Sequence, residues 1–201
     1  MMGPMAGTGG AARRATGAAV LLVSLALAGC TADPPGEPPP STSEQAALRV
    51  RTVHATEGMD SEAQAAAEAA VGDVLSDYVV RAFLGDYPRE DFVGSFESFT
   101  GDLARRAAGD LDQLTANRVA EAEAVTATRL EADLSFLVRD SETYGATASV
   151  RFTFEATVDG EARPLGLRGR LMLVAKNDTW SVFGYDVETE TGEAVEAGVT
   201  S

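Results

Sequence analysis

A change in hydrophobic period near residue 120 is the feature that most limits how this chain can fold. Between residues 61 and 114, apolar residues recur every three or four positions, which is the period of an amphipathic helix. After residue 120 they alternate with polar residues, which is the period of a strand with one buried face. Because helices precede strands rather than alternate with them, the expected fold class is α+β.

The second half contains four alternating runs that are separated by turn-forming residues. These runs cover residues 130–138, 146–158, 165–175 and 179–188. Asp159-Gly160 lies between two of them, and Asp-Gly between alternating runs is a strong hairpin signal. We therefore expect an antiparallel meander of long strands, with bends or bulges at Gly169 and Gly184. One face of this meander is apolar, and the earlier helices are the segments available to cover it.

A long helix is expected over residues 61–84. Ser61 and Gln64 match a capping box at its start, while Gly85 and Pro88 are typical of residues beyond its end. Its apolar stripe contains Val71, Val74, Leu75, Tyr78, Val79, Ala82 and Phe83. We expect this stripe to pack on the sheet. The residues expected opposite it are Phe152, Leu171 and one of Trp180 or Phe183.

Shorter patterns flank this helix on both sides. Alternation over residues 48–53 predicts a short leading strand. Thr100 is placed to cap a second helix, with Asp102 in its first turn. The residues expected on one face of that helical segment are Phe99, Leu103, Ala107, Leu111 and Leu114.

The amino-terminal region has the organisation of a secretory signal. Arg13 and Arg14 precede a stretch of apolar or small residues, Ala15 to Leu27, that is about 13 residues long. At ~1.5 Å rise per residue it extends ~20 Å, short of the ~30 Å hydrocarbon core of a bilayer. We therefore expect the apolar region of a signal peptide rather than a membrane span. The paired arginines leave a twin-arginine route open, although the residues after them favour Sec export.

The only cysteine of the chain, Cys30, follows this stretch. Leu27-Ala28-Gly29-Cys30 resembles the bacterial lipobox, in which the cysteine thiol receives diacylglycerol and a peptidase cleaves after the small residues. An exported chain with one cysteine cannot form an internal disulfide, and lipidation explains why Cys30 stands alone. We expect a protein that is anchored through Cys30 to the outer face of the cytoplasmic membrane. The alternatives are an ordinary secreted protein and a chance match to the lipobox.

Four segments are expected along the chain. They are a signal peptide over residues 1–29, a lipidated cysteine and proline-rich tether over 30–46, an α+β domain over 47–190 and a disordered acidic tail over 191–201. Acidic residues outnumber basic ones 31 to 16, which gives a net charge of −15. Such a field repels phosphate backbones, so nucleic acid is not expected as a partner. The scarcity of lysine beside abundant arginine, alanine and glycine is typical of a high-GC host such as an actinobacterium.

Motifs for cofactors and metals are not evident in the sequence. His54 is the only histidine, and no P-loop, dinucleotide-binding or zinc motif follows the signal region. Asp110 and Asp112 would point to different sides of a helix, which does not favour shared coordination. We therefore expect no metal and no cofactor.

Two segments carry a resemblance to a known fold family. They are YVVRAFLGDYPREDFVGSF and GRLMLVAKNDTWSVFGYDVE. Over roughly residues 60–190 the chain resembles the nuclear transport factor 2-like fold, a cone-shaped family that includes ketosteroid isomerases, SnoaL-like cyclases and Mce-associated proteins. The resemblance implies N-terminal helices packed on a curved antiparallel β-meander. It implies no particular activity, because this fold hosts enzymes, binding domains and scaffolds.

The resemblance leaves two functional hypotheses. Isomerases of this family use a tyrosine of the first helix and inward carboxylates, so Tyr78, with Asp110 or Asp133, would be the matching groups. However, Tyr78 lies in the apolar stripe and Asp133 alternates with apolar residues, so we do not assign them catalytic roles. We favour a non-enzymatic binding or scaffold domain for an envelope protein or an apolar ligand; a small isomerase or cyclase is the alternative. The possible pocket residues are Tyr78, Trp180 and Tyr185, with Trp180 and Tyr185 expected on opposite faces of the last strand.

The lipidation of Cys30 can be tested directly. We expect the native protein to begin at Cys30 and to carry a lipidated amino-terminal peptide in mass spectrometry. The Cys30→Ala variant should keep its signal peptide uncleaved at this site. A variant that is still processed after Gly29 and still membrane-bound would contradict this expectation.

Overall fold

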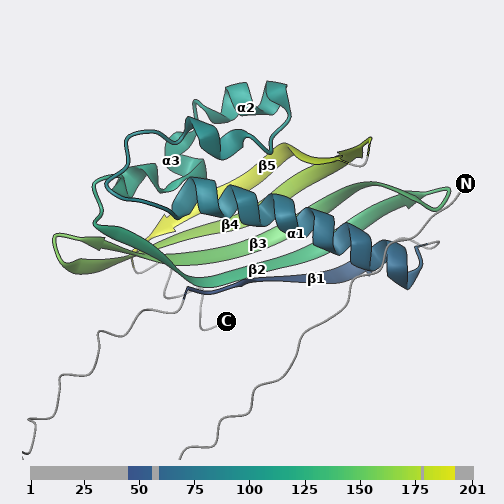
Figure 1. The fold of residues 1–201 in the computed structure, drawn as a ribbon, viewed down its shortest axis with the longest axis horizontal. Helices are drawn as coiled ribbons and strands as arrows, with labels where there is room; N and C mark the ends of the chain where they lie inside the picture. The colour runs from purple at the N-terminus through teal and green to yellow at the C-terminus, as the bar shows by residue number, and fades with distance from the viewer. Residues whose placement is uncertain (1–44, 56–58, 178, 193–201) are drawn as a thin grey trace, which may run out of the picture. The chain divides into compact units, whose positions relative to one another are not determined.

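The structure is a computed structural model that describes residues 45–55, 59–177 and 179–192. The described residues form an α+β arrangement in which helices pack on one face of a five-stranded sheet, as Figure 1 shows. The elements are β1 (Leu48–Ala55), α1 (Ser61–Phe83), η1 (Val93–Phe96), α2 (Gly101–Ala107), α3 (Leu111–Leu114), η2 (Ala116–Val119), β2 (Ala124–Arg139), β3 (Glu142–Val158), β4 (Glu161–Lys176) and β5 (Thr179–Thr191). The expected signal peptide, the lipobox with Cys30 and most of the expected tether and tail lie outside the described residues.

The sheet order is β1-β2-β3-β4-β5. Strands β2 to β5 form the predicted antiparallel meander, and Asp159-Gly160 forms the turn between β3 and β4 with positive φ at both residues. Strand β1, however, pairs in parallel with β2, so the sheet is mixed rather than wholly antiparallel. The reason is the long connection through all the helices, which returns the chain to the end of the sheet where β1 began.

The sheet pairing extends slightly beyond the expected domain limits. The backbone N–H of Ala46 donates to the carbonyl of Ala127 at 3.0 Å, which ties one residue of the expected tether to β2. At the other terminus, β5 runs to Thr191, the first residue of the expected tail. The register places Leu48 opposite Leu130, and Thr191 opposite Leu165, so both ends of the domain lie at the same end of the sheet as the β3–β4 turn. The β2–β3 and β4–β5 turns lie at the opposite end, which we call the hairpin end.

Helix α1 begins one residue away from the expected cap. Asp60 is the N-cap, and its side chain accepts from the N–H of Ala63 at 2.8 Å. Ser61 is already helical, and Gln64 donates to Glu68 instead of reaching back, so the predicted capping box does not form. The carboxylate of Asp60 thus caps the N–H of Ala63. The N–H of Gln64 donates to the backbone carbonyl of Asp60 at 3.0 Å. The predicted end is confirmed, because the helix stops at Phe83 and Gly85 takes a φ of 106°.

The second half of α1 forms the centre of the hydrophobic core. Tyr78 and Phe83 are fully buried, and the Phe83 ring stacks on Phe154 of β3 with ring centres 4.5 Å apart. Phe152 and Leu171 are fully buried on the same sheet face, as expected. Val74 is only partly buried. Of the two aromatic residues proposed to face the helix, Trp180 packs against the core, whereas Phe183 is 48% exposed.

The region after α1 is more broken than the sequence predicts. Phe92 and Phe96 anchor a short 3-10 segment and are buried. Thr100 is at the N-cap of α2, but its side chain makes no capping hydrogen bond. The single helical segment expected to continue to Leu114 is divided at Ala108–Asp110 into α2 and α3. Glycine and aspartate are weak helix formers, so Gly109-Asp110 favours this break.

The packing of α1 can be tested by truncation at two positions of different burial. Phe83→Ala removes a fully buried ring and should cost ~3–5 kcal/mol of unfolding free energy. Val80→Ala, on the same helix but 54% exposed, should change it by less than about 0.5 kcal/mol. Urea denaturation of both variants measures the difference. Equal midpoints would contradict the packing of α1 on the sheet.

Candidate functional site

The three residues proposed for a pocket have different environments. Tyr78 is fully buried, and its hydroxyl donates to the carbonyl of Leu114 in α3. Its ring contacts Phe83 and Phe99, so this part of the interior is filled with side chains. Burial raises the pKa of Tyr78 well above its usual value. A phenol in this position supports the core and does not face an open site.

Tyr185 helps to hold α3 against β5. Its hydroxyl donates to a carboxylate oxygen of Asp110, the N-cap residue of α3. Gln113 of α3 donates to the carbonyl of Val187, and Thr189 donates to the carbonyl of Gln113. Together with the bond from Tyr78 to Leu114, these contacts fix α3 between α1 and β5. Asp110 and Tyr185 therefore meet, but in a contact that has a structural role.

A bulge in β5 corrects the expected orientation of two aromatic residues. Strict alternation would place Trp180 and Tyr185 on opposite sides of the strand. The register shifts between Met172 and Leu173 of β4, where Phe183 is the extra residue of β5. One inserted residue reverses the alternation beyond it. Trp180 and Tyr185 consequently both pack against the core side of the sheet.

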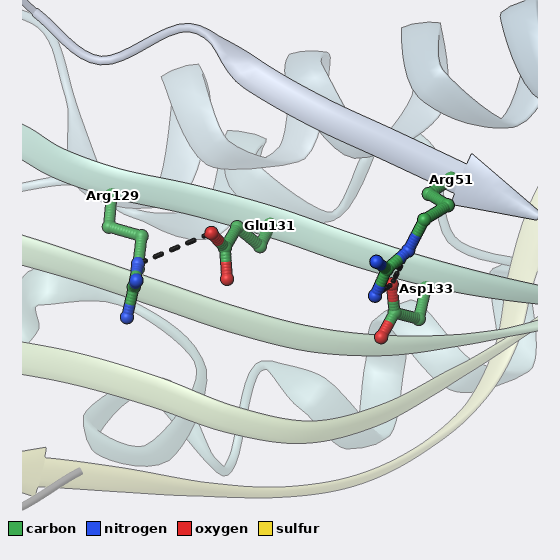
Figure 2. Close-up of polar contacts among 4 residues, drawn as sticks. All are labelled: Arg51, Arg129, Glu131 and Asp133. Atoms are coloured by element: carbon green, nitrogen blue, oxygen red, sulfur yellow. Dashed lines mark hydrogen bonds and ion pairs between the residues drawn. The ribbon is translucent and has the colours of Figure 1, made fainter. Parts of the chain in front are cut away.

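Asp133 lies on the other face of the sheet, which we call the outer face. It accepts from Nε and Nη2 of Arg51 at 3.0 and 2.7 Å, as Figure 2 shows. Arg129 and Glu131 form a neighbouring ion pair with a separation of 3.3 Å on the same face. Asp133 is thus directed away from the core, as the sequence alternation predicts. His54 is exposed on β1 and pairs with Ser135 of β2.

Trp180 is the pocket candidate that lines an open cleft. The cleft lies at the hairpin end between α1 and the sheet and has a volume of about 510 Å³. Three alanines of α1 form one wall, and Tyr144 and Trp180 contribute aromatic surface. The lining residues are Ala66, Ala67, Ala70, Glu142, Thr143, Tyr144, Ala175, Lys176, Asn177 and Trp180.

The cleft exists because the two halves of α1 differ in side-chain size. The second half fills the space above the sheet with Leu75, Tyr78 and Phe83. The first half carries the sequence AQAAAEAA, and its methyl groups are too small to fill the same space. The sequence analysis did not identify this site. The run of alanines on a helix that covers a sheet was the available signal.

The chemistry of the cleft favours apolar contact. Its volume is in the range of small-molecule sites, and its walls combine methyl groups with two aromatic rings. Glu142 and Lys176 are its charged residues, and both are exposed at the rim. Among the described residues, no group of three or more His, Cys, Asp or Glu side chains is placed to hold a metal ion. The cleft can therefore accept an apolar group and offers no desolvated acid–base pair.

Comparisons with known proteins do not assign the chain to a family. No protein-family model matches it, and no curated protein or solved structure shows detectable similarity. Within the part of the chain that the structure describes, no helix is long and apolar enough to cross a membrane.

The hydrogen bond from Tyr185 of β5 to Asp110, at the start of α3, predicts that the contribution of Tyr185 to stability depends on pH. Burial, and then the hydrogen bond to Asp110, raise the pKa of Tyr185 to about 12, above the ~10 of an unfolded tyrosine. The contribution of Tyr185 to stability is therefore complete below about pH 10 and is lost as the pH rises towards 12. Tyr185→Phe should lower the unfolding free energy by about 1 kcal/mol at pH 7.

The difference between parent and Tyr185→Phe is the informative quantity. Tyr78 and Tyr87 also have raised pKa values, and they remain in the variant. The difference should be constant from pH 7 to 9 and should shrink between pH 10 and 12. Denaturant unfolding at each pH measures this difference in unfolding free energy. A difference that grows with pH would contradict a stabilising hydrogen bond between Tyr185 and Asp110.

Proposed function

We propose that this protein is a lipid-anchored, extracytoplasmic binding protein that holds an apolar group in the cleft beside Trp180. The observation that carries the proposal is an open cleft between α1 and the sheet, where the methyl groups of α1 face the rings of Tyr144 and Trp180. The lipobox-like sequence ending at Cys30 supports attachment to the outer face of the cytoplasmic membrane. The apolar group is a small ligand or a side chain of an envelope protein.

The fold proposal follows the resemblance in the sequence. Helices come first in the chain, a long meander follows, and the helices cover one face of the sheet. This order supports a nuclear transport factor 2-like cone. Because that fold hosts several activities, the functional argument rests on the cleft and not on the fold.

Binding accounts for the site better than catalysis does. An isomerase or cyclase needs a positioned acid or base next to the substrate. Tyr78 is fully buried, and its hydroxyl donates a hydrogen bond to the carbonyl of Leu114. The hydroxyl of Tyr185 already donates to Asp110. The carboxylate of Glu142 and the ammonium of Lys176 at the cleft are exposed. The described residues thus favour a site that recognises shape and apolar surface.

The position of the cleft is suited to a partner in the envelope. The domain begins near Ala46, at the end of the sheet opposite the hairpin end. The expected tether, at ~3 Å per residue for extended proline-rich chain, would span ~40–50 Å. A domain attached in this way presents the cleft at the end remote from its tether.

Filling part of the cleft should weaken binding without unfolding the domain. Trp180 is the only tryptophan of the chain, so its emission reports occupancy of the cleft. We expect residues 45–201, expressed without the anchor and shown to fold by circular dichroism, to give a blue shift on titration with sodium dodecanoate below its micelle concentration. Ala70→Leu places a larger side chain in the cleft and should weaken this binding at least about tenfold, since a buried leucine side chain adds several methylene-sized groups.

Ala63→Leu is the matched control. Ala63 is exposed on the same helix and lines neither this cleft nor the hollow between α1 and β1, so the variant should bind as the parent does. Leucine and alanine have similar helix propensities, which keeps the two variants comparable. Equal weakening in both variants, or no change in Trp180 emission at saturating dodecanoate, would contradict binding in the cleft.

A further inference from the structure

The two edge strands of the sheet differ in how their free backbone groups are satisfied. At β5, the N–H of Val182 donates to the carbonyl of Ser98 at 3.0 Å, and its carbonyl accepts from the N–H of Thr100 at 2.8 Å. The side chain of Gln113 donates to the carbonyl of Val187 on the same strand. Segments that precede β2 in the chain therefore cover part of the β5 edge.

Strand β1 forms the other edge and has no comparable cover. Figure 1 shows it along the side of the sheet opposite β5. Among the described residues, no backbone-to-backbone hydrogen bond joins β1 to any element other than β2. An edge strand of this kind presents a row of unpaired N–H and C=O groups. Another extended backbone satisfies such a row, because its own groups repeat at the same spacing.

The hollow between α1 and β1 lies beside this edge and has a volume of about 400 Å³. Leu48 and Val50 form its β1 side. Helix α1 is close to β1 here, since a Cβ added at Gly72 would lie 3.4 Å from Cγ2 of Val50. The small side chains of α1 leave room for a side chain that enters from outside. They share one stripe of the helix and are Ala65, Ala69, Gly72 and Ser76.

Both charged residues of this hollow are acidic. Glu68 is partly buried and Asp73 is exposed, and no basic side chain is among the lining residues. Polar contact with Thr52 of β1, and then with Gln64, lowers the pKa of Glu68, so its carboxylate is charged at neutral pH. Neither acid forms an ion pair with another residue of the described ranges. A lysine or arginine suits this site, because its aliphatic stem packs on small apolar residues while its charged group reaches a carboxylate.

A second copy of the chain is a poor occupant of this edge. Two β1 strands paired antiparallel about a two-fold axis would bring Arg49 and Arg51 beside the same arginines of the other copy. On the helix side, Glu68 and Asp73 would approach their own copies in the same way. Like charges that face each other across paired strands are destabilising. The charges therefore favour a strand from a different protein.

We propose that the β1 edge binds an extended segment of a partner protein, which adds a sixth strand to the sheet and places a lysine or arginine in the hollow between α1 and β1. The register of β1 with β2 is unbroken from Leu48 to Thr52 and shifts before His54, so the added strand pairs with the first part of β1. Backbone pairing provides affinity, and the basic side chain provides specificity. The proposal goes beyond the proposed binding function and does not depend on the cleft.

A synthetic peptide tests strand addition with the full-length protein in a neutral detergent. The probe is fluorescein-labelled Thr-Lys-Thr-Lys-Thr-Lys-Thr, and fluorescence anisotropy measures its binding. An added strand directs the N–H groups of one alternate set of its residues to the edge. Methylation of the backbone nitrogens of one set, lysine or threonine, should therefore abolish binding, and methylation of the other set should leave it unchanged. Equal binding by both methylated peptides would show charge attraction without strand pairing and would overturn the proposal. No binding of the unmethylated peptide would also overturn it.

Two matched charge reversals locate the bound peptide. Asp73→Lys places a positive charge at the hollow and should weaken binding at least about fivefold at 0.1 M salt, because it repels the lysines of the probe. Glu62→Lys makes the same charge change at an exposed position of α1 outside the hollow. At ~1.5 Å rise per residue it is about 16 Å from Asp73 along the helix, beyond the ~10 Å Debye length. Glu62→Lys should therefore bind the probe as the parent does. Equal weakening in both variants, each shown to fold by circular dichroism, would overturn the assignment of the site.

Discussion

The structure depends on the burial of one helix face against one sheet face. The second half of α1 buries Leu75, Tyr78 and Phe83 over the apolar side of the meander, and Phe83 stacks on Phe154. Burying each such side chain contributes ~1.5–3 kcal/mol, comparable with a large part of the ~5–15 kcal/mol by which a domain is stable. Helix α3 is then fixed by its bonds to Tyr78 and Tyr185, so its position follows from that of α1.

The same helix produces the candidate site because its side chains change in size along its length. Large residues close the space over the sheet at one end, and alanines leave it open at the other. The two faces of the sheet also differ: the inner face is apolar and covered, whereas the outer face combines paired charges with an exposed apolar hollow. Core, cleft and outer face thus arise from one arrangement of α1 on the sheet.

Much of the fold could be predicted from the sequence because hydrophobic period records which side of an element is buried. The strand runs, the Asp159-Gly160 turn and the stripe of α1 follow from local patterns. The bulge expected at Gly184 is present beside it, at Phe183. Two features depend on distant parts of the chain and could not be predicted from local patterns. They are the parallel pairing of β1 and the sheet residues that meet the alanines of α1 at the cleft beside Trp180. The cap predicted at Ser61 was a local error, because the N-cap is Asp60, one residue earlier.

Amide hydrogen exchange along α1 tests the central claim, that one half of this helix closes the core while the other bounds an open cleft. The amides of Leu75, Tyr78, Val79, Ala82 and Phe83 should exchange only through global unfolding, because these side chains are buried in the core. Those from Gln64 to Ala70 should exchange faster through local opening and should slow when dodecanoate is bound. Uniform protection along the whole helix, unchanged by dodecanoate, would contradict the account.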